Sequence, residues 1–256
     1  FGTTDATGAW SQRDSFDMLE LAQSRYFSQH PDVSAPKLAE FLSRMPTHTV
    51  RSEEQIIYQA FSTPIDIAHL AVRLAAITDQ DTVLEPSAGT GLLAAMAMKK
   101  AASVHLNELN PTRYGALRET FPKLSITRYD ATKIDTMLAS TIRPSVILMN
   151  PPFSKDLKIG DDPYAAVRHL RSALRLLSPG GRLVAIMPDW FTNSAKLADI
   201  YAKTFANCSV IYSARLGEGA YRKHGTSIAV RLFAIDKTAG NITPVIMQRE
   251  CALDLS

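Results

Sequence analysis

The chain has 256 residues and 46% of them are hydrophobic, which is enough for one substantial core in a single large α/β domain. Its 28 Lys and Arg against 25 Asp and Glu give a formal net charge of +3, so any nucleic-acid surface has to be local. Cys208 and Cys251 lack metal-ligand spacing, and no segment resembles a membrane span or signal peptide; we expect a cytoplasmic protein without a metal site or a membrane partner.

The first part of the chain carries helical signals. Amphipathic spacing predicts helices over residues 15–28 and 34–44, and Ser52 with Gln55 matches a capping box that opens a third helix. We therefore expect a helical N-terminal extension over residues 1–51, followed by the main domain over residues 52–256.

Strand and helix signals then alternate, which indicates a mostly parallel sheet. Helices are predicted after Pro64, at 92–97, after Asn110-Pro111, at 164–177 and at 194–206. Strands are predicted at 82–85, 103–108, 124–129, 146–149 and 182–187, with 209–215 and 227–235 as a terminal hairpin. The expected fold is α/β: a Rossmann-like, doubly wound, seven-stranded, mostly parallel sheet with an antiparallel terminal hairpin.

A loop with two glycines joins the first strand to its helix, and glycine lets backbone approach a ligand closely. It lacks the third glycine of the dinucleotide fingerprint and the Gly-Lys-Ser/Thr of a phosphate loop. Glu85 at its start would repel phosphate but favours the ammonium and sulfonium of S-adenosylmethionine. The loop therefore predicts contacts to this cofactor from Glu85, Ser87, Ala88, Gly89 and Gly91.

Two further acids follow the next two strands. Glu108 stands where a carboxylate accepts hydrogen bonds from both ribose hydroxyls, and Asp130, followed by Ala131, is placed to accept from the adenine amino group of the cofactor. Each acid alone is equally well explained as a solvated strand-end carboxylate. Three acids at the ligand-binding edge of one sheet instead predict a cofactor site.

The most specific motif follows the fourth strand and reads Asn150-Pro151-Pro152-Phe153. An aromatic amino group is a poor nucleophile because its lone pair is delocalised. If the Asn150 side-chain oxygen and the Pro151 carbonyl each accept one N–H, the lone pair turns toward the methyl donor. We predict these four residues as catalytic, Asn150 also as a cofactor contact, and Phe153 as a stacking face for the target base; the alternative is an ordinary proline turn.

These motifs, together with Tyr58-Gln59-Ala60-Phe61-Ser62-Thr63-Pro64, resemble the amino-group DNA methyltransferases, especially N6-adenine enzymes of γ-type motif order, over residues 52–237. The resemblance implies a site-specific DNA adenine methyltransferase in which Phe61, Ser62 and Thr63 contact the methionine part of S-adenosylmethionine. It also implies that Tyr221 stacks on the flipped base. An exposed loop tyrosine remains the alternative for Tyr221.

Basic residues near the predicted pocket are candidates for phosphate contacts: Lys155, Lys158, Arg222 and Lys223. Neither cysteine follows a proline, which excludes cytosine C5 chemistry. Few residues remain after the last strand, and the chain begins at Phe1; we expect DNA recognition to come from the rest of a longer polypeptide or a separate domain. Large phage- or plasmid-borne proteins that join a methylase to a helicase-like region, acting in restriction-modification or antirestriction, look similar.

Other functions remain open. The Asn-Pro-Pro-Phe chemistry is similar to that of enzymes that methylate RNA bases, at adenine N6 or guanine N2, and of enzymes that methylate glutamine in release factors. The segment from Phe61 to Pro64 favours DNA adenine over these. From other classes, a catalytically silent module that binds cofactor or nucleic acid, and more distantly a nicotinamide-dependent oxidoreductase, remain as alternatives.

Overall fold

The computed structural model describes residues 7–8, 12–47, 61–153, 155–156, 160–217 and 219–238. Within 12–13, 155–156 and 160–161 the description covers the backbone alone. The capping box predicted at Ser52 and Gln55, the residue Lys158 and the predicted boundary between residues 51 and 52 lie outside these ranges.

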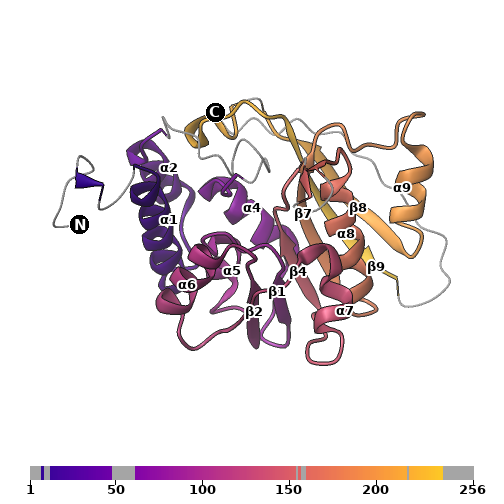
Figure 1. Ribbon diagram of the computed structural model, residues 1–256, viewed down its shortest axis with the longest axis horizontal. Helices are drawn as coiled ribbons and strands as arrows, with labels where there is room; N and C mark the ends of the chain where they lie inside the picture. The colour runs from indigo at the N-terminus through magenta and orange to yellow at the C-terminus, as the bar shows by residue number, and fades with distance from the viewer. Residues whose placement is uncertain are drawn as a thin grey trace.

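A seven-stranded sheet with the order β3-β2-β1-β4-β7-β9-β8 forms the centre of the molecule (Figure 1). Its strands are β1 (Thr82–Glu85), β2 (Ser103–Asn107), β3 (Ser125–Thr127), β4 (Val146–Met149), β7 (Arg182–Pro188), β8 (Cys208–Arg215) and β9 (Val230–Lys237). The pairs β1–β2, β2–β3, β1–β4 and β4–β7 are parallel, whereas β9 is antiparallel to both β7 and β8. This confirms the predicted Rossmann-like sheet with its antiparallel terminal hairpin.

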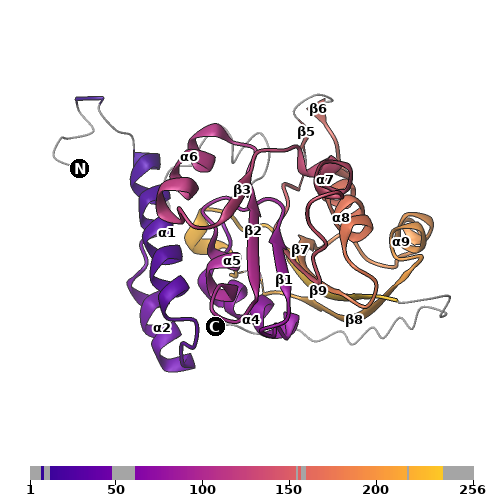
Figure 2. The ribbon, with the colours of Figure 1, turned by 90° about the horizontal axis from the view of Figure 1, so that it is seen from below.

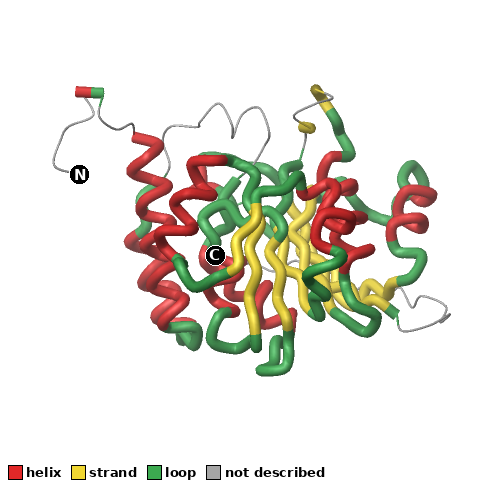
Figure 3. The backbone as a smooth tube through the Cα atoms, turned by 60° about the horizontal axis from the view of Figure 1, so that its bottom comes forward, coloured by secondary structure: helices red, strands yellow, loops and turns green. Residues whose placement is uncertain are grey.

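Helices cover both faces of the sheet (Figure 3). The helices α7 (Ile134–Leu138), α8 (Ala165–Leu176) and α9 (Ala198–Thr204) lie together on one side, and α5 (Leu92–Ala97) and α6 (Pro111–Thr120) lie on the other (Figure 2). Helix α4 (Ile65–Ala75) packs against α5. Because both faces are covered, all four residues of β4 are buried, as expected for a central parallel strand.

Two N-terminal helices, α1 (Gln12–Gln29) and α2 (Ala35–Arg44), form a further layer outside α5 and α6 (Figure 1). Helix α1 contacts both α5 and α6, and its Leu21 and Phe27 belong to the main hydrophobic core. Burial of these apolar side chains docks the helix onto the domain. The N-terminal helices therefore share one core with the sheet.

Local signals placed most element ends to within one or two residues, although α9 begins at Ala198 rather than at residue 194. Asn110 caps α6, and its side-chain oxygen accepts hydrogen bonds from the backbone N–H groups of Thr112 and Arg113 at 2.9 and 3.0 Å. Strand β9 begins at Val230 rather than at residue 227, and Val230 is the first of its residues to pair with β7, opposite Pro188. The two-residue strands β5 (Lys155–Asp156) and β6 (Gly160–Asp161) were not predicted, since they are too short for any periodicity.

Candidate cofactor and target site

The loops that follow β1, β2 and β3 are joined by one buried side chain, Asn107, at the end of β2. Its Nδ2 donates to the carbonyls of Pro86 and Tyr129, both at 2.9 Å, and its Oδ1 accepts from the Tyr129 N–H at 2.8 Å and the Thr127 hydroxyl at 2.9 Å. These bonds use the full capacity of the amide. Sequence reasoning missed Asn107, although a polar residue ending an apolar strand was a visible signal.

The glycine loop lies directly beside these residues. Gly89 and Gly91 both have left-handed backbone, with φ of +56° and +79°. A Cβ on Gly91 would lie 3.0 Å from the Leu117 side chain, so glycine is required there for packing as well as for conformation. The Gly89 N–H donates to Glu108 Oε2 at 2.7 Å, which brings the ends of β1 and β2 together.

Glu85 is almost completely buried at the end of β1. Its Oε2 accepts from the backbone N–H of Ala94 at 2.8 Å, in the first turn of α5. Burial raises the pKa of Glu85 well above its usual value; the Ala94 hydrogen bond opposes this shift and the nearby Glu108 adds to it. Glu85 therefore supports the start of α5 behind the glycine loop, and its predicted contact to the cofactor stays a prediction.

Glu108 and Asp130 stand at the same edge, and each accepts hydrogen bonds from the chain that follows it. Glu108 Oε1 accepts from the Asn110 N–H at 2.8 Å. Asp130 Oδ1 accepts from the N–H and hydroxyl of Thr132, at 2.9 and 2.7 Å. Burial alone would raise the pKa of Asp130, but these bonds together with His169 and Lys133 hold it below its usual value. Both acids therefore remain suited to accept from hydroxyl or amino groups. Ser87 is half-buried, and Ala88 and Ala131 are buried beside them.

Asn150 is tied to the segment that precedes α4. Its Nδ2 donates to the Phe61 carbonyl at 2.9 Å and to the Thr63 hydroxyl at 3.1 Å. Both N–H hydrogens of the amide thus have acceptors, which fixes the direction in which Oδ1 points. The structure therefore brings the predicted catalytic asparagine together with the predicted cofactor segment, 87 and 89 positions away in the chain.

Tyr221 lies at the same place and is fully buried, so it is not the exposed loop tyrosine of the alternative interpretation. Its ring centroid is 6.5 Å from that of Phe61, with the ring planes at 70°. Burial raises the pKa of the Tyr221 phenol above its usual range; the Asn150 side chain opposes this shift and Asp66 adds to it. Tyr221 is thus packed among the predicted cofactor and catalytic residues, and base stacking by its ring stays a prediction.

The loop that carries Tyr221 (residues 216–229, called the Tyr221 loop) joins β8 to β9 at one side of the sheet and reaches the N-terminal helices (Figure 1). The Lys223 ammonium donates to the carbonyls of Leu42 and Met45, the latter at 3.0 Å, at the end of α2. A cation is favourable at this helix end. Two of the three ammonium donors of Lys223 are thus engaged, and its predicted phosphate contact stays a prediction; the neighbouring Arg222 is exposed.

Phe153 and Lys155 are two further residues that were predicted to contact the target. Phe153 has 3% of its surface exposed and belongs to the hydrophobic core, as does the fully buried Tyr221, and its stacking on the target base stays a prediction. The apolar surroundings at the end of β4 explain this inward placement. Pro151 is buried and Pro152 half-buried. Lys155 is described by its backbone alone, in β5.

An exposed aromatic pair at this edge was not predicted. Trp190 follows β7 and Tyr164 precedes α8; they are 41% and 37% exposed, with ring centroids 5.8 Å apart and planes at 81°. Because α8 leads from β4 to β7 and these strands are neighbours, the pair lies at the edge that Asn150 occupies. The position of Trp190 directly after β7 was the sequence signal that could have identified it as a site residue.

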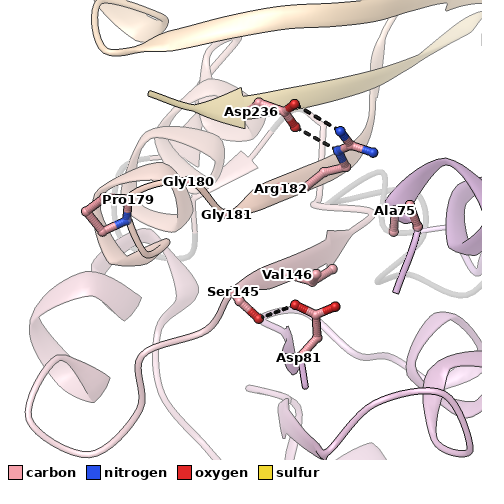
Figure 4. A pocket seen from close by; sticks show the side chains of 10 residues that line it. Ala75, Asp81, Ser145, Val146, Pro179, Gly180, Gly181, Arg182 and Asp236 are labelled. Atoms are coloured by element: carbon pink, nitrogen blue, oxygen red, sulfur yellow. Dashed lines mark hydrogen bonds and ion pairs between the residues drawn. The ribbon is translucent and has the colours of Figure 1, made fainter. Parts of the chain in front are cut away.

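A pocket lies at the opposite edge, where β1, β4 and β7 begin (Figure 4). Its polar groups bond to one another: Arg182 donates to both carboxylate oxygens of Asp236, at 2.7 and 2.9 Å, and the Ser145 hydroxyl donates to Asp81 at 2.6 Å. Cys208 begins β8 at the same edge, and burial raises the pKa of its thiol to about 11. These residues stabilise strand starts, far from Asn150.

In the part of the chain that the structure describes, no group of three or more His, Cys, Asp or Glu side chains is arranged to hold a metal ion. No helix there is long and apolar enough to cross a membrane.

Comparison with known proteins places this site in a family. Residues 62–215, more than half of the chain, match the model of the methyltransferase small domain. No curated protein sequence matches the chain.

Similar solved structures share the fold at low identity. A protein from Vibrio vulnificus described as a modification subunit of a type I restriction enzyme has a TM-score of 0.60 and 20% identity over 71% of this chain and 45% of its own. A protein from Listeria monocytogenes, described as a class I S-adenosylmethionine-dependent methyltransferase, has a TM-score of 0.61 and 13% identity over 85% of this chain and 70% of its own. A protein from Pyrococcus horikoshii, described as an RNA methyltransferase, has a TM-score of 0.56 and 17% identity over 80% of this chain and 100% of its own.

The chain thus spans less than half the length of the Vibrio subunit. Its fold, its glycine loop and its family match agree with one another, since the matched residues include the glycine loop, Asn150 and the segment before α4. The chain belongs to the methyltransferase small domain family.

Proposed function

We propose that this protein transfers a methyl group from S-adenosylmethionine to the N6 amino group of adenine in DNA. The observation that carries the proposal is the fixed Asn150 amide, whose Nδ2 donates to Phe61 and Thr63. Methyl transfer itself follows from the family, and the target is inferred from the residues around Asn150.

The residues beside the glycine loop fit the cofactor. Glu108 is placed to accept from ribose hydroxyls, because it is a carboxylate at the ligand-binding edge of the sheet, directly after β2 and bonded to the Gly89 N–H of the glycine loop. Asp130 is placed to accept from an adenine amino group, and Phe61, Ser62 and Thr63 to contact the methionine end. When bound, the cofactor supplies a methyl group made electrophilic by the sulfonium.

Asn150 and Pro151 act on the target amine. Asn150 Oδ1 and the Pro151 carbonyl each accept one N–H, which pulls the nitrogen toward tetrahedral geometry and directs its lone pair at the donor. No strong base is needed, because the work is positioning. Tyr221, packed beside Phe61, supplies the stacking surface for a flipped base, and the Phe153 ring anchors the motif in the core.

DNA adenine is favoured over RNA and protein by the segment from Phe61 to Thr63, which resembles that of the N6-adenine enzymes. Trp190 and Tyr164 provide exposed aromatic surface for neighbouring bases, and Arg222 a cation for a phosphate. Sequence specificity is supplied by a further domain or a longer polypeptide; the protein described as a modification subunit from Vibrio vulnificus is longer than this chain. The biological role that fits this reaction is restriction-modification or antirestriction in the cytoplasm.

The test is to incubate the purified chain with radiolabelled S-adenosylmethionine and, separately, duplex DNA, single-stranded DNA, RNA and cell protein, with Asn150→Ala as the control. Labelled N6-methyldeoxyadenosine from DNA is the expected product. Label recovered in RNA nucleosides or in protein glutamine instead would show that RNA or protein, and not DNA, is the substrate. No label in any polymer, with cofactor binding retained in calorimetry, would replace catalysis by the silent-module alternative for this chain.

A further inference from the structure

A buried carboxylate from the N-terminal helix reaches the candidate site. Glu20 lies on α1 and is 4% exposed. Its Oε2 accepts from the Ser62 hydroxyl at 2.6 Å and from the Thr90 hydroxyl at 3.4 Å. Its Oε1 lies 3.8 Å from His224 Nδ1.

These partners of Glu20 come from three different parts of the site. Ser62 belongs to the segment predicted to contact the cofactor, and Thr90 belongs to the glycine loop. His224 belongs to the Tyr221 loop. One carboxylate thus bonds or faces three segments of the candidate site: the segment before α4, the glycine loop and the Tyr221 loop.

Packing of α1 does not require an acid at this place. The helix buries Phe16, Leu21 and Phe27, which supply its apolar contact with the core. Burying a carboxylate is unfavourable unless hydrogen bonds or opposite charge offset the loss of water, and an apolar side chain would dock a helix at least as well. The contacts that Glu20 makes therefore account for its presence better than helix docking does.

The same helices hold the Tyr221 loop a second time. Lys223 donates to carbonyls at the end of α2, and the adjacent His224 faces Glu20 on α1. Because Tyr221 lies two and three positions before them, the N-terminal helices set where its ring rests against Phe61.

We infer that Glu20 is a positioning residue of the methyltransferase site, which orients the Ser62 and Thr90 hydroxyls for the cofactor and holds the Tyr221 loop over Asn150. This inference rests on the proposed cofactor site and extends it to α1, which the sequence places in a separate extension. It makes the N-terminal helices part of the site.

The experiment measures S-adenosylmethionine affinity by calorimetry, without nucleic acid, for Glu20→Ala, Glu20→Gln and the control Asp17→Asn. Asp17 lies on the same helix, and its Oδ1 is 3.9 Å from Arg113 Nη2 of α6, so its loss weakens docking of α1 away from the cofactor site. Glu20→Ala is expected to weaken affinity by about tenfold or more, since hydrogen bonds to a charged group are lost. Glu20→Gln, which retains one acceptor oxygen, should fall between, and Asp17→Asn should bind like the wild type.

A second readout separates positioning from stability. Thermal unfolding of the ligand-free proteins should place Glu20→Gln within the range of Asp17→Asn, while their affinities differ. The inference would be overturned if wild type and Glu20→Gln bound S-adenosylmethionine with equal affinity, or if Glu20→Gln and Asp17→Asn lost equal amounts of that affinity. Should Glu20→Ala not fold, Glu20→Gln decides. If the DNA target is wrong, wild-type cofactor affinity is still measurable, so the two failures are distinguishable.

Discussion

The side-chain nitrogen of Asn150 lies 3.1 Å from the hydroxyl oxygen of Thr63, a hydrogen bond that joins the end of β4 to the segment before α4. With the Phe61 carbonyl as a second acceptor, the amide is held from one side. The residue expected to act on the target and the residues expected to contact the donor are therefore one hydrogen-bonded unit.

Replacement of Asn150 by Ala should reduce kcat by on the order of 10²–10³, because a positioned acceptor for the target amine is lost. Cofactor affinity should change much less than kcat, because the cofactor segment loses only its hydrogen bonds to the amide, whereas the target amine loses its acceptor. Single-turnover rates and calorimetry on the same preparations measure both. The matched variant Thr63→Val keeps Oδ1 and loosens the amide, and should give a smaller loss of kcat. A large loss of cofactor affinity in Asn150→Ala would instead assign Asn150 to cofactor support.

Tyr221 should act through its ring. Tyr221→Ala should weaken binding of the flipped base by about 1–3 kcal/mol, the usual range for base–aromatic stacking, and raise the KM for DNA. Tyr221→Phe keeps the ring and should retain near-normal kcat/KM. Fluorescence of 2-aminopurine at the target position reports flipping directly. Equal defects in the two variants would place the function of Tyr221 in its hydroxyl, beside Asn150.

Trp190 should contribute to target binding without affecting the cofactor. Trp190→Ala removes a side chain that is 41% exposed beside Tyr164, and we expect weaker DNA binding with unchanged S-adenosylmethionine affinity. Ile211→Ala is the control, since Ile211 is similarly exposed, at 38%, on the outermost strand β8. Fluorescence anisotropy with labelled DNA measures the difference. Equal effects of the two substitutions would remove Trp190 from the target surface.

Glu85 should make stability depend on pH. Because burial raises its pKa in the folded state above 4.5, folding favours the protonated form. Its contribution to stability is therefore fully present below pH 4.5 and declines as the pH rises through the folded-state pKa. Glu85→Gln should thus gain stability relative to wild type as the pH rises, measured by urea unfolding across this range. Glu119→Gln, an exposed acid on α6, serves as the control. A difference between wild type and Glu85→Gln that does not change with pH would contradict this account.

The sequence predicts best where a local rule decides the structure. Strands β1 and β4 were placed at both ends, because proline follows each within two residues and their apolar runs are short and continuous. The cap at Asn110 followed from its side chain and the proline after it. The three acids at one edge followed from counting strand ends in a doubly wound sheet.

The contacts that complete the site were beyond such rules. Asn107 bonds to residues some twenty positions away on either side, and Glu20 bonds to Ser62 and Thr90 at separations of 42 and 70. Neither residue belongs to a motif, so their roles depend on tertiary packing. Tyr221 was located as a candidate, but its burial depends on what covers the loop, which local sequence does not record.

The pair of Glu20 and His224 joins residues 204 positions apart. During synthesis α1 emerges long before its partner, and the Tyr221 loop cannot be held until β9 has left the ribosome and paired with β7. Contacts of such long sequence separation form late in folding. A nascent chain that already contains the glycine loop and Asn150 therefore still lacks these contacts, and if Glu20 positions the site as we infer, methylation waits for the finished domain.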